Sequence, residues 1–185
     1  MSDYLLSKRY AHALFDLAIE FKKTEVAKKD MEFIRQTLHE SRDLKAFLKS
    51  PLIKPDKKVK AVNAIFKDQV DLLTIRFLAL VIKQRREALL ENIAIEFIEI
   101  YKEYNNIITI EMTTAAEISK ETRELILKVL GELRNANIEL IEKTDSSLIG
   151  GFVLRMGDKQ YDSSLRASLK KLKKEFEENL YERKF

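Results

Sequence analysis

Apolar residues recur every three or four positions through the first 104 residues, the spacing that places them on one face of an α-helix. This half contains no glycine, and its only prolines are Pro51 and Pro55. The pattern predicts six helices joined by short connections, at residues 4–22, 24–40, 44–49, 56–67, 71–84 and 87–104, and such helices form a bundle. The last helix has the clearest apolar stripe, which consists of Leu90, Ala94, Phe97, Tyr101 and Tyr104.

After Asn105 and Asn106 the pattern changes to one typical of strands and helices in alternation. Residues 107–113 are rich in β-branched side chains, residues 119–135 have helical spacing, and residues 138–143 are again strand-like. A hairpin and a final helix follow, so the order is β-α-β-β-β-α, which indicates a small α+β domain. The sequence therefore predicts an α+β protein with a six-helix bundle at residues 1–105 and a small α+β domain at residues 106–185.

Three of the four glycines lie between residues 150 and 157, where they are used for backbone geometry. Gly157-Asp158 lies between the mostly apolar residues 152–156 and the segment 159–161 and has the form of a type II′ hairpin turn, with the positive φ at glycine. Asp162, Ser163 and Ser164 then offer side-chain oxygens to the free amides of a helix that begins near Leu165. Asp158 and Asp162 could also converge on Ca²⁺ or Mg²⁺, but a turn residue and a helix cap are the interpretation we prefer.

The final helix has one apolar stripe and several lysines on its other faces. Lysines at this density are usually a solvated surface, although Lys170 to Lys174 could also contact the phosphates of a nucleic acid. The stripe either seals its own domain or meets a partner. Its members are Leu165, Leu169, Leu172, Phe176 and Leu180.

The first and fifth predicted helices are apolar over more than one face. In the first helix the polar residues His12, Asp16 and Glu20 fall into one narrow arc, and apolar residues occupy most of the rest. The helix at 71–84 is apolar almost all round. Two interpretations are open, because these helices either form the centre of the bundle or border an apolar groove that accepts an amphipathic helix from another chain.

Composition excludes several classes of protein. The chain has 185 residues, of which 45% are hydrophobic, enough for a buried core, and it has no cysteine and hence no disulfide or thiolate nucleophile. The longest apolar run, Phe77 to Ile82, is far shorter than the ~20 residues of a membrane-spanning helix, and the N-terminus does not read as a signal or transit peptide. The net charge of +4 is spread thinly over the first half, which disfavours nucleic-acid binding.

Candidate catalytic and metal sites are weak. His12 and Asp16 read as a surface ion pair, and Glu96 and Glu99 as solvated carboxylates with no histidine beside them. The sequence contains neither a Gly-x-Ser-x-Gly elbow nor a glycine-rich phosphate loop. We therefore predict no enzyme activity, cofactor or metal.

Three motifs resemble the δ subunit of the F-type ATP synthase, the family that includes the mitochondrial oligomycin-sensitivity subunit. Residues 10–18 match the Tyr-Ala-x-Ala-x-Phe-x-x-Ala core of its first helix, and residues 77–86 match an apolar helix that ends in arginine, here Arg86. Two residues depart from the pattern, since Arg85 and Ser163 stand where many members have glycine. The third motif is the C-terminal signature Gly150, Gly151, Gly157, Asp158, Asp162, Ser164, Leu165, Leu169 and Leu172.

The resemblance implies a non-catalytic stator subunit that links the F1 head to the membrane-bound Fo sector. It implies that the N-terminal helix of an α subunit binds between the first and fifth helices, and that b-type stalk subunits bind the C-terminal domain. It also implies a peripheral position on the cytoplasmic face of a bacterial inner membrane, or the stromal face of a thylakoid, with neither nucleic acid nor membrane insertion. The alternatives are a nucleic-acid-binding module and an unrelated helical adaptor. The residues that the resemblance assigns to the α-subunit helix are Tyr10, Ala13, Phe77 and Leu80, with Leu14, Leu17, Val81 and Gln84 beside them.

Overall fold

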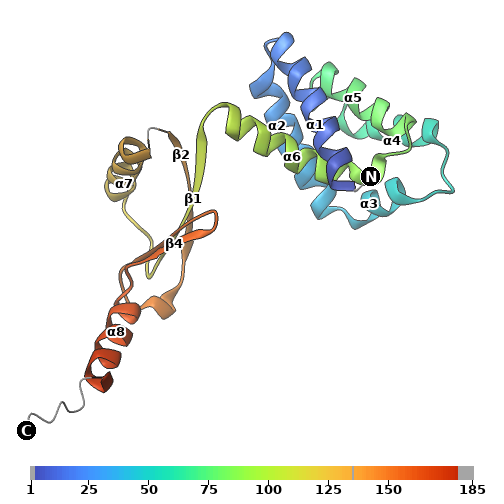
Figure 1. Ribbon diagram of the computed structural model, residues 1–185. Coiled ribbons are helices and arrows are strands. Elements are labelled where there is room, and N and C mark those ends of the chain that lie inside the picture. The colour runs from blue at the N-terminus through green and yellow to red at the C-terminus, as the bar shows by residue number, and fades with distance from the viewer. Residues whose placement is uncertain (1–2, 135, 179–185) are drawn as a thin grey trace, which may run out of the picture. The chain divides into compact units, whose positions relative to one another are not determined.

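The computed structural model describes residues 3–134 and 136–178, which form helices and one four-stranded sheet. The predicted α+β class is therefore confirmed. The chain divides into two compact units, Met1–Tyr104 and Asn105–Phe185 (Figure 1). Asn135 and Leu180, the predicted ends of a helix and of the last apolar stripe, lie outside the described residues.

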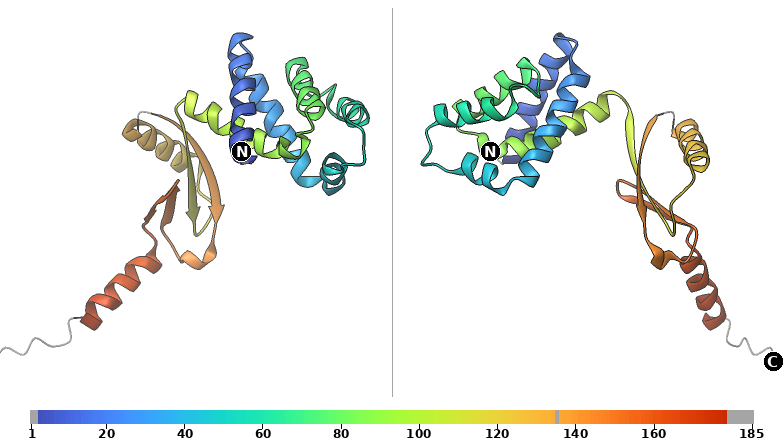
Figure 2. Two further views of the ribbon diagram at one scale, coloured as in Figure 1. Left: turned by 45° about the vertical axis from the view of Figure 1, so that its right-hand side comes forward. Right: turned by 180° about the vertical axis from the view of Figure 1, so that it is seen from behind.

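Helices make up the first unit, and they follow the predicted ranges closely. Helix α6 packs against both α1 and α2, and α4 packs against α5 (Figures 1 and 2). The helices are α1 (Asp3–Glu20), α2 (Thr24–Glu40), α3 (Arg42–Lys49), α4 (Pro55–Phe66), α5 (Leu72–Lys83) and α6 (Leu90–Tyr104), with a 3-10 turn η1 (Glu87–Leu89) before α6.

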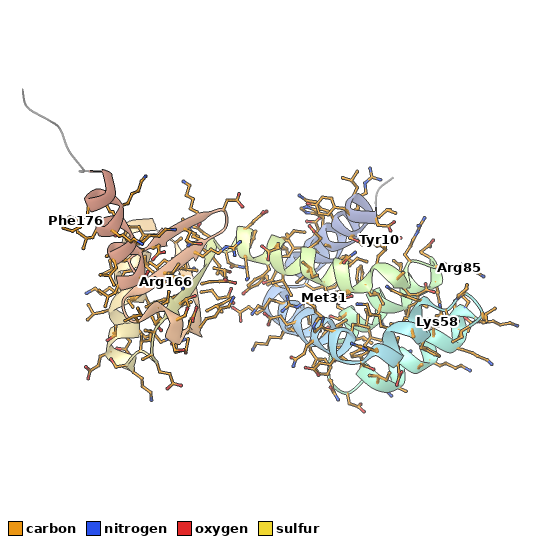
Figure 3. All side chains as sticks on the ribbon, turned by 90° about the horizontal axis from the view of Figure 1, so that it is seen from below. Tyr10, Met31, Lys58, Arg85, Arg166 and Phe176 are labelled. Carbon is orange, nitrogen blue, oxygen red and sulfur yellow. The ribbon has the colours of Figure 1, made fainter. Side chains whose placement is uncertain are left out.

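One continuous apolar core joins these helices. Leu14, Ala18, Ile93, Ala94 and Phe97 are each inaccessible to solvent, so the small alanines let α1 and α6 approach closely while the larger side chains fill the space. The Phe15 and Phe97 rings meet edge to face, with 5.7 Å between their centroids. Met31 of α2 extends the core to that helix (Figure 3).

Side-chain caps and backbone geometry set the helix boundaries. The Ser41 side chain accepts a hydrogen bond from Leu44 N at the start of α3, and Asp71 does the same for Leu73 N at the start of α5. Between α5 and η1, Arg85 has a φ of 57°, in the left-handed region that favours glycine. Glycine would adopt this backbone conformation without strain, and the helix predicted from residue 87 begins with a 3-10 turn.

The second unit is a sheet with the strand order β2-β1-β3-β4, and the strands and helices alternate as predicted. Strands β1 and β2 are parallel neighbours, and helix α7 connects them along the chain. Strand β3 pairs antiparallel with β1 and with β4. One sheet face is apolar, with Ile110 and Met112 buried in it. The elements are β1 (Ile107–Thr114), α7 (Lys120–Arg134), β2 (Asn137–Thr144), the 3-10 turn η2 (Ser146–Leu148), β3 (Phe152–Met156), β4 (Lys159–Asp162) and α8 (Leu165–Glu178).

The glycine-rich segment has the predicted geometry. Gly157 has a φ of 54° in the β3–β4 turn, and Asp158 is not among the residues with positive φ, as a type II′ turn requires. Asp162 Oδ1 accepts a hydrogen bond from Ser164 N, and Ser164 Oγ accepts one from Ala167 N. Asp162 and Ser164 are therefore the turn and cap residues that begin α8.

Candidate functional site

A groove of about 550 Å³ runs between α1 and α5 on the surface of the first unit. Helix α1 packs mainly against α6, and the outer edges of α1 and α5 leave the groove open between them. The Tyr10 and Phe77 rings meet edge to face at 6.5 Å and join the two walls. The groove is lined by Tyr10, Ala13, Leu17, Phe21, Lys23, Asp71, Leu72, Leu73, Arg76, Phe77 and Leu80.

The two walls run in opposite directions. Tyr10 of α1 lies beside Phe77 of α5, whereas Lys23, just after α1, contacts Asp71 at the start of α5. Leu17, Phe21, Leu72 and Leu80 are large apolar residues that remain substantially exposed in this groove. A surface of this kind, narrow and apolar, matches the stripe of an amphipathic helix.

The structure places the predicted groove residues in two groups. Five of them, Tyr10, Ala13, Leu17, Phe77 and Leu80, line the groove. The other three do not. Leu14 and Val81 are 0% exposed because they face the interior on the inner sides of α1 and α5, so their placement at a partner surface is corrected: they are core residues. Gln84 is the C-cap of α5 and does not line the groove.

One end of the groove is polar, and its charges are already paired. Lys23 Nζ lies 2.7 Å from Asp71 Oδ2, and Asp71 Oδ1 caps α5 through Leu73 N. The hydrogen bond from Lys23, followed by that from Leu73 N, lowers the pKa of the Asp71 carboxyl. Buried Asp30 accepts hydrogen bonds from Asp71 N and from Thr74 Oγ1, so α2 is tied to the first turn of α5.

Sequence reasoning missed several residues of the groove. Leu72 and Leu73 lie in the all-apolar helix, but periodicity does not tell which of its faces meets solvent. Lys23, Asp71 and Arg76 are charged, and a charged residue on a helix surface normally carries no signal of its own. The spacing of Leu72, Arg76 and Leu80 indicates that Arg76 shares a helix face with the two leucines, since residues four apart lie on one face.

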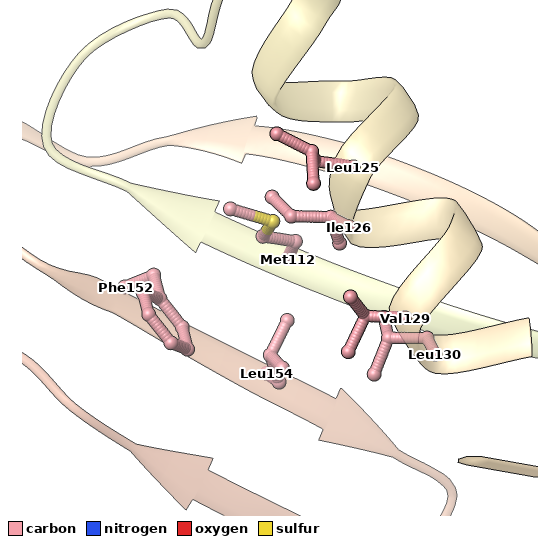
Figure 4. Close-up of a pocket in the computed structure, with 7 residues that line it drawn as sticks. All are labelled: Met112, Leu125, Ile126, Val129, Leu130, Phe152 and Leu154. Atoms are coloured by element: carbon pink, nitrogen blue, oxygen red, sulfur yellow. The ribbon is translucent and has the colours of Figure 1, made fainter. Parts of the chain in front are cut away.

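A second apolar surface lies within the second unit, where α7 covers the apolar face of the sheet incompletely. A hollow of about 250 Å³ remains between them, and all of its lining side chains are apolar (Figure 4). Leu125 and Val129 of α7 are substantially exposed there. The other lining residues are Met112, Ile126, Leu130, Phe152 and Leu154.

The apolar stripe of α8 is also uncovered among the described residues. Leu165, Leu169, Leu172 and Phe176 are all largely exposed, so the stripe does not seal its own domain. In Figures 1 and 2 the helix runs away from the sheet rather than across it. The lysines of α8, Lys170 to Lys174, are exposed on its remaining surface.

A buried charged pair, Lys58 with Glu87, lies in the first unit outside the groove. Lys58, labelled in Figure 3, is only 2% exposed. Its Nζ donates to the Leu48 carbonyl at 2.5 Å and pairs with Glu87 Oε1. These contacts link α3, α4 and η1. A buried lysine requires such partners, because leaving its charge unpaired in the interior is costly.

The described residues contain no group of three or more His, Cys, Asp or Glu side chains that could hold a metal ion. The predicted His12–Asp16 pair is not formed, and His39 lies 3.7 Å from Glu91, which also pairs with Lys45. Among the same residues, no helix has the length and apolar character needed to cross a bilayer.

Comparison with known proteins decides the family. The model of the family described as ATP synthase delta (OSCP) subunit matches residues 6–176. The chain belongs to this family. The resemblance read from the groove helices and the glycine segment is thereby confirmed, and the nucleic-acid module and the unrelated adaptor are set aside.

Individual relatives of the ATP synthase delta (OSCP) family agree over nearly the whole chain. Proteins called ATP synthase subunit delta are 35% identical in Cytophaga hutchinsonii, covering 97% of this chain and 98% of the relative, and 36% identical in Christiangramia forsetii, covering 95% of each. A chain in the structure of the Toxoplasma gondii mitochondrial ATP synthase hexamer has the same fold. Its TM-score is 0.67 at 23% identity, and 92% of this chain and 97% of that chain are covered.

Proposed function

We propose that this subunit acts in the peripheral stalk as a stator that links the F1 catalytic head to the membrane-bound Fo sector. Proton-driven rotation yields ATP only if the head does not turn with the rotor, so the head needs a fixed attachment. The observation that carries the proposal is the groove between α1 and α5, which five of the predicted partner-binding residues line. In this role the first unit holds the head and the second unit holds the stalk.

The partner proposed for the groove is the N-terminal helix of an α subunit. An amphipathic helix would bury its apolar stripe against Leu17, Phe21, Leu72 and Leu80, which are exposed in the free chain. Complete burial of one such side chain contributes about 1.5–3 kcal/mol, so a few of them support stable binding. Ala13 leaves space at which a bulky side chain of the partner can enter.

The partner proposed for the second unit is the C-terminal part of the b-type stalk helices. Two observations support this assignment: the open hollow between α7 and the sheet, and the uncovered stripe of α8. Both surfaces are apolar and suit helices rather than polar ligands. The two units together would then connect two different partners.

The proposed contribution of this chain is binding affinity and rigidity, while ATP turnover belongs to other subunits. Its two histidines, His12 and His39, line neither surface, and the Lys23–Asp71 pair in the groove is bonded to itself and to the first turn of α5. We place the chain at the membrane through its partners only, on the cytoplasmic face in a bacterium.

Calorimetric titration with a synthetic peptide of the α-subunit N-terminus tests the proposal. Leu80→Asp should weaken binding about tenfold or more, because it places a carboxylate in the apolar groove. Leu5→Asp is the matched control, since Leu5 is 52% exposed on α1, Leu80 is 50% exposed, and Leu5 does not line the groove. Equal affinities for both variants, with helical content unchanged, would contradict the assignment of the groove.

A further inference from the structure

Arg76 occupies an unusual place in the groove between α1 and α5. It lies one helical turn after Leu72 and one turn before Leu80, and these three residues form the outer edge of the α5 wall. Leu72 and Leu80 are substantially exposed apolar residues. Arg76 is therefore a charge in the middle of an otherwise apolar edge.

Among the described residues, Arg76 makes neither an ion pair nor a hydrogen bond through its side chain. The other cation in the lining, Lys23, is held by Asp71, whose second carboxylate oxygen caps α5. Arg76 is thus the unpaired cation of this groove within the described residues. An apolar helix seated here would remove water from the guanidinium without replacing its hydrogen bonds, which is unfavourable.

The opposite edge of the groove, on α1, carries the opposite charge near the Phe21 end. Asp16 comes three residues after Ala13, and Glu20 three residues after Leu17. Each carboxylate is therefore displaced by about 60° around the helix axis from the groove-lining residue that it follows. They lie on the solvent side, because Leu14 and Ala18 on the other side of this row are fully buried. Both carboxylates are exposed and have no partner among the described residues.

We propose that Arg76 binds a carboxylate on the edge of the helix that occupies the groove, and that the oppositely charged edges fix the direction of that helix. The inference rests on the proposed function, since it takes the α-subunit helix as the occupant. It requires this helix to be acidic along the flank that faces α5 and basic along the flank that faces Asp16 and Glu20.

The chemistry of arginine suits this role. The guanidinium offers a planar pair of N–H groups that a carboxylate accepts in a bidentate manner, so the contact fixes position as well as charge. A bound helix presents one flank to α5 and the other to α1, and reversing its direction exchanges the two flanks. The reversed helix would place carboxylates beside Asp16 and Glu20, and like charges in such positions repel.

The test uses the full chain and a synthetic peptide of the N-terminal helix of the α subunit that accompanies it. Arg76→Glu should raise the Kd about tenfold, and Arg76→Gln about threefold, because the first change repels the carboxylate and the second only removes the attraction. Changing one particular carboxylate residue of the peptide to arginine should restore most of the lost affinity for the Arg76→Glu variant. A peptide with its acidic and basic flanks exchanged should bind the unchanged protein more weakly.

Lys83→Glu is the matched control. Lys83 is an exposed cation in the last turn of the same helix and does not line the groove, so its reversal should change the Kd by less than about twofold. Three results would overturn the role of Arg76 while leaving the proposed function intact. They are an equal loss of affinity in Lys83→Glu and Arg76→Glu, an unchanged affinity in Arg76→Glu, and a failure of every carboxylate-to-arginine change in the peptide to restore binding. Absence of binding by the unchanged protein would overturn the proposed function and this inference with it.

Discussion

Gly151, just before β3, lies against the backbone of Ser163 and Ser164, just before α8. This close contact is possible because Gly151 has no side chain. Its φ is 80°, and a Cβ added there would lie 2.2 Å from the Ser163 carbonyl oxygen, a backbone atom that cannot move aside easily. Two backbone hydrogen bonds hold the same region, from Ser163 N to the Phe152 carbonyl and from Leu165 N to the Gly150 carbonyl. The glycine pair therefore fixes where α8 begins.

Gly151→Ala should lower the free energy of unfolding of the second unit by about 2–4 kcal/mol, because it combines backbone strain with a steric clash. Gly157→Ala is the control, since Gly157 also has a positive φ but an added Cβ there meets nothing within 4 Å. That change should cost only about 1 kcal/mol. Chemical denaturation followed by circular dichroism measures both, and equal losses would refute the proposed clash.

Other individual residues show where sequence reasoning is limited. The turn at Gly157 and the cap at Ser164 were predictable, because both follow from local backbone chemistry. The burial of Lys58 was not predictable, since its partner Glu87 is 29 residues away in the sequence. Leu14 and Val81 were assigned to the partner surface because they adjoin Ala13 and Leu80 in the sequence, but successive residues of a helix point about 100° apart, and both are buried.

Among the elements, α5 depends on a charged cap at its first turn. Asp71 pairs with Lys23 and caps Leu73 N, and the pKa of its carboxyl is lowered below the ordinary value of 3.8. Because the pKa is lower in the folded state, the ionised carboxylate stabilises the fold fully at pH values above the ordinary pKa of 3.8. The stabilisation is lost as the pH falls through the folded-state pKa.

Asp71→Asn keeps a cap acceptor but removes the charge, so it should lower the stability by about 1 kcal/mol at neutral pH. The difference from the unchanged protein should shrink as the pH falls below 3.8, because the native carboxyl is then protonated as well. Asp68→Asn, at an exposed position just before α5, provides the control. Denaturation curves across the acidic range check this, and a difference independent of pH would contradict the role of the charge.

For the whole molecule, the change of sequence pattern at Asn105 coincides with the boundary between the two compact units. Each unit has its own apolar interior, centred on α6 in one and on the α7 face of the sheet in the other. The class of the fold was predictable because the first half keeps helical spacing throughout, whereas the second half changes between strand and helix spacing from one segment to the next. The groove could be predicted only through the family, since an exposed apolar face and a buried one look alike in sequence.

We expect residues 1–104, expressed alone, to fold and to bind the α-subunit peptide within about threefold of the affinity of the full chain, because every groove residue lies in this segment. Residues 105–185 should not bind that peptide. Calorimetry on both fragments measures this, with circular dichroism to establish folding. Loss of binding by a folded 1–104 fragment would indicate that the second unit contributes to the groove.

Strand β1 receives any tension that passes along the chain from one unit to the other, since only Asn105 and Asn106 separate it from α6. It is an inner strand, paired over eight residues with β2 and over four with β3. A pull along its axis loads these hydrogen bonds in shear, so that many must break together rather than one after another. Torque transmitted through this stator subunit from one unit to the other would therefore load β1, a strand that is hydrogen-bonded on both sides.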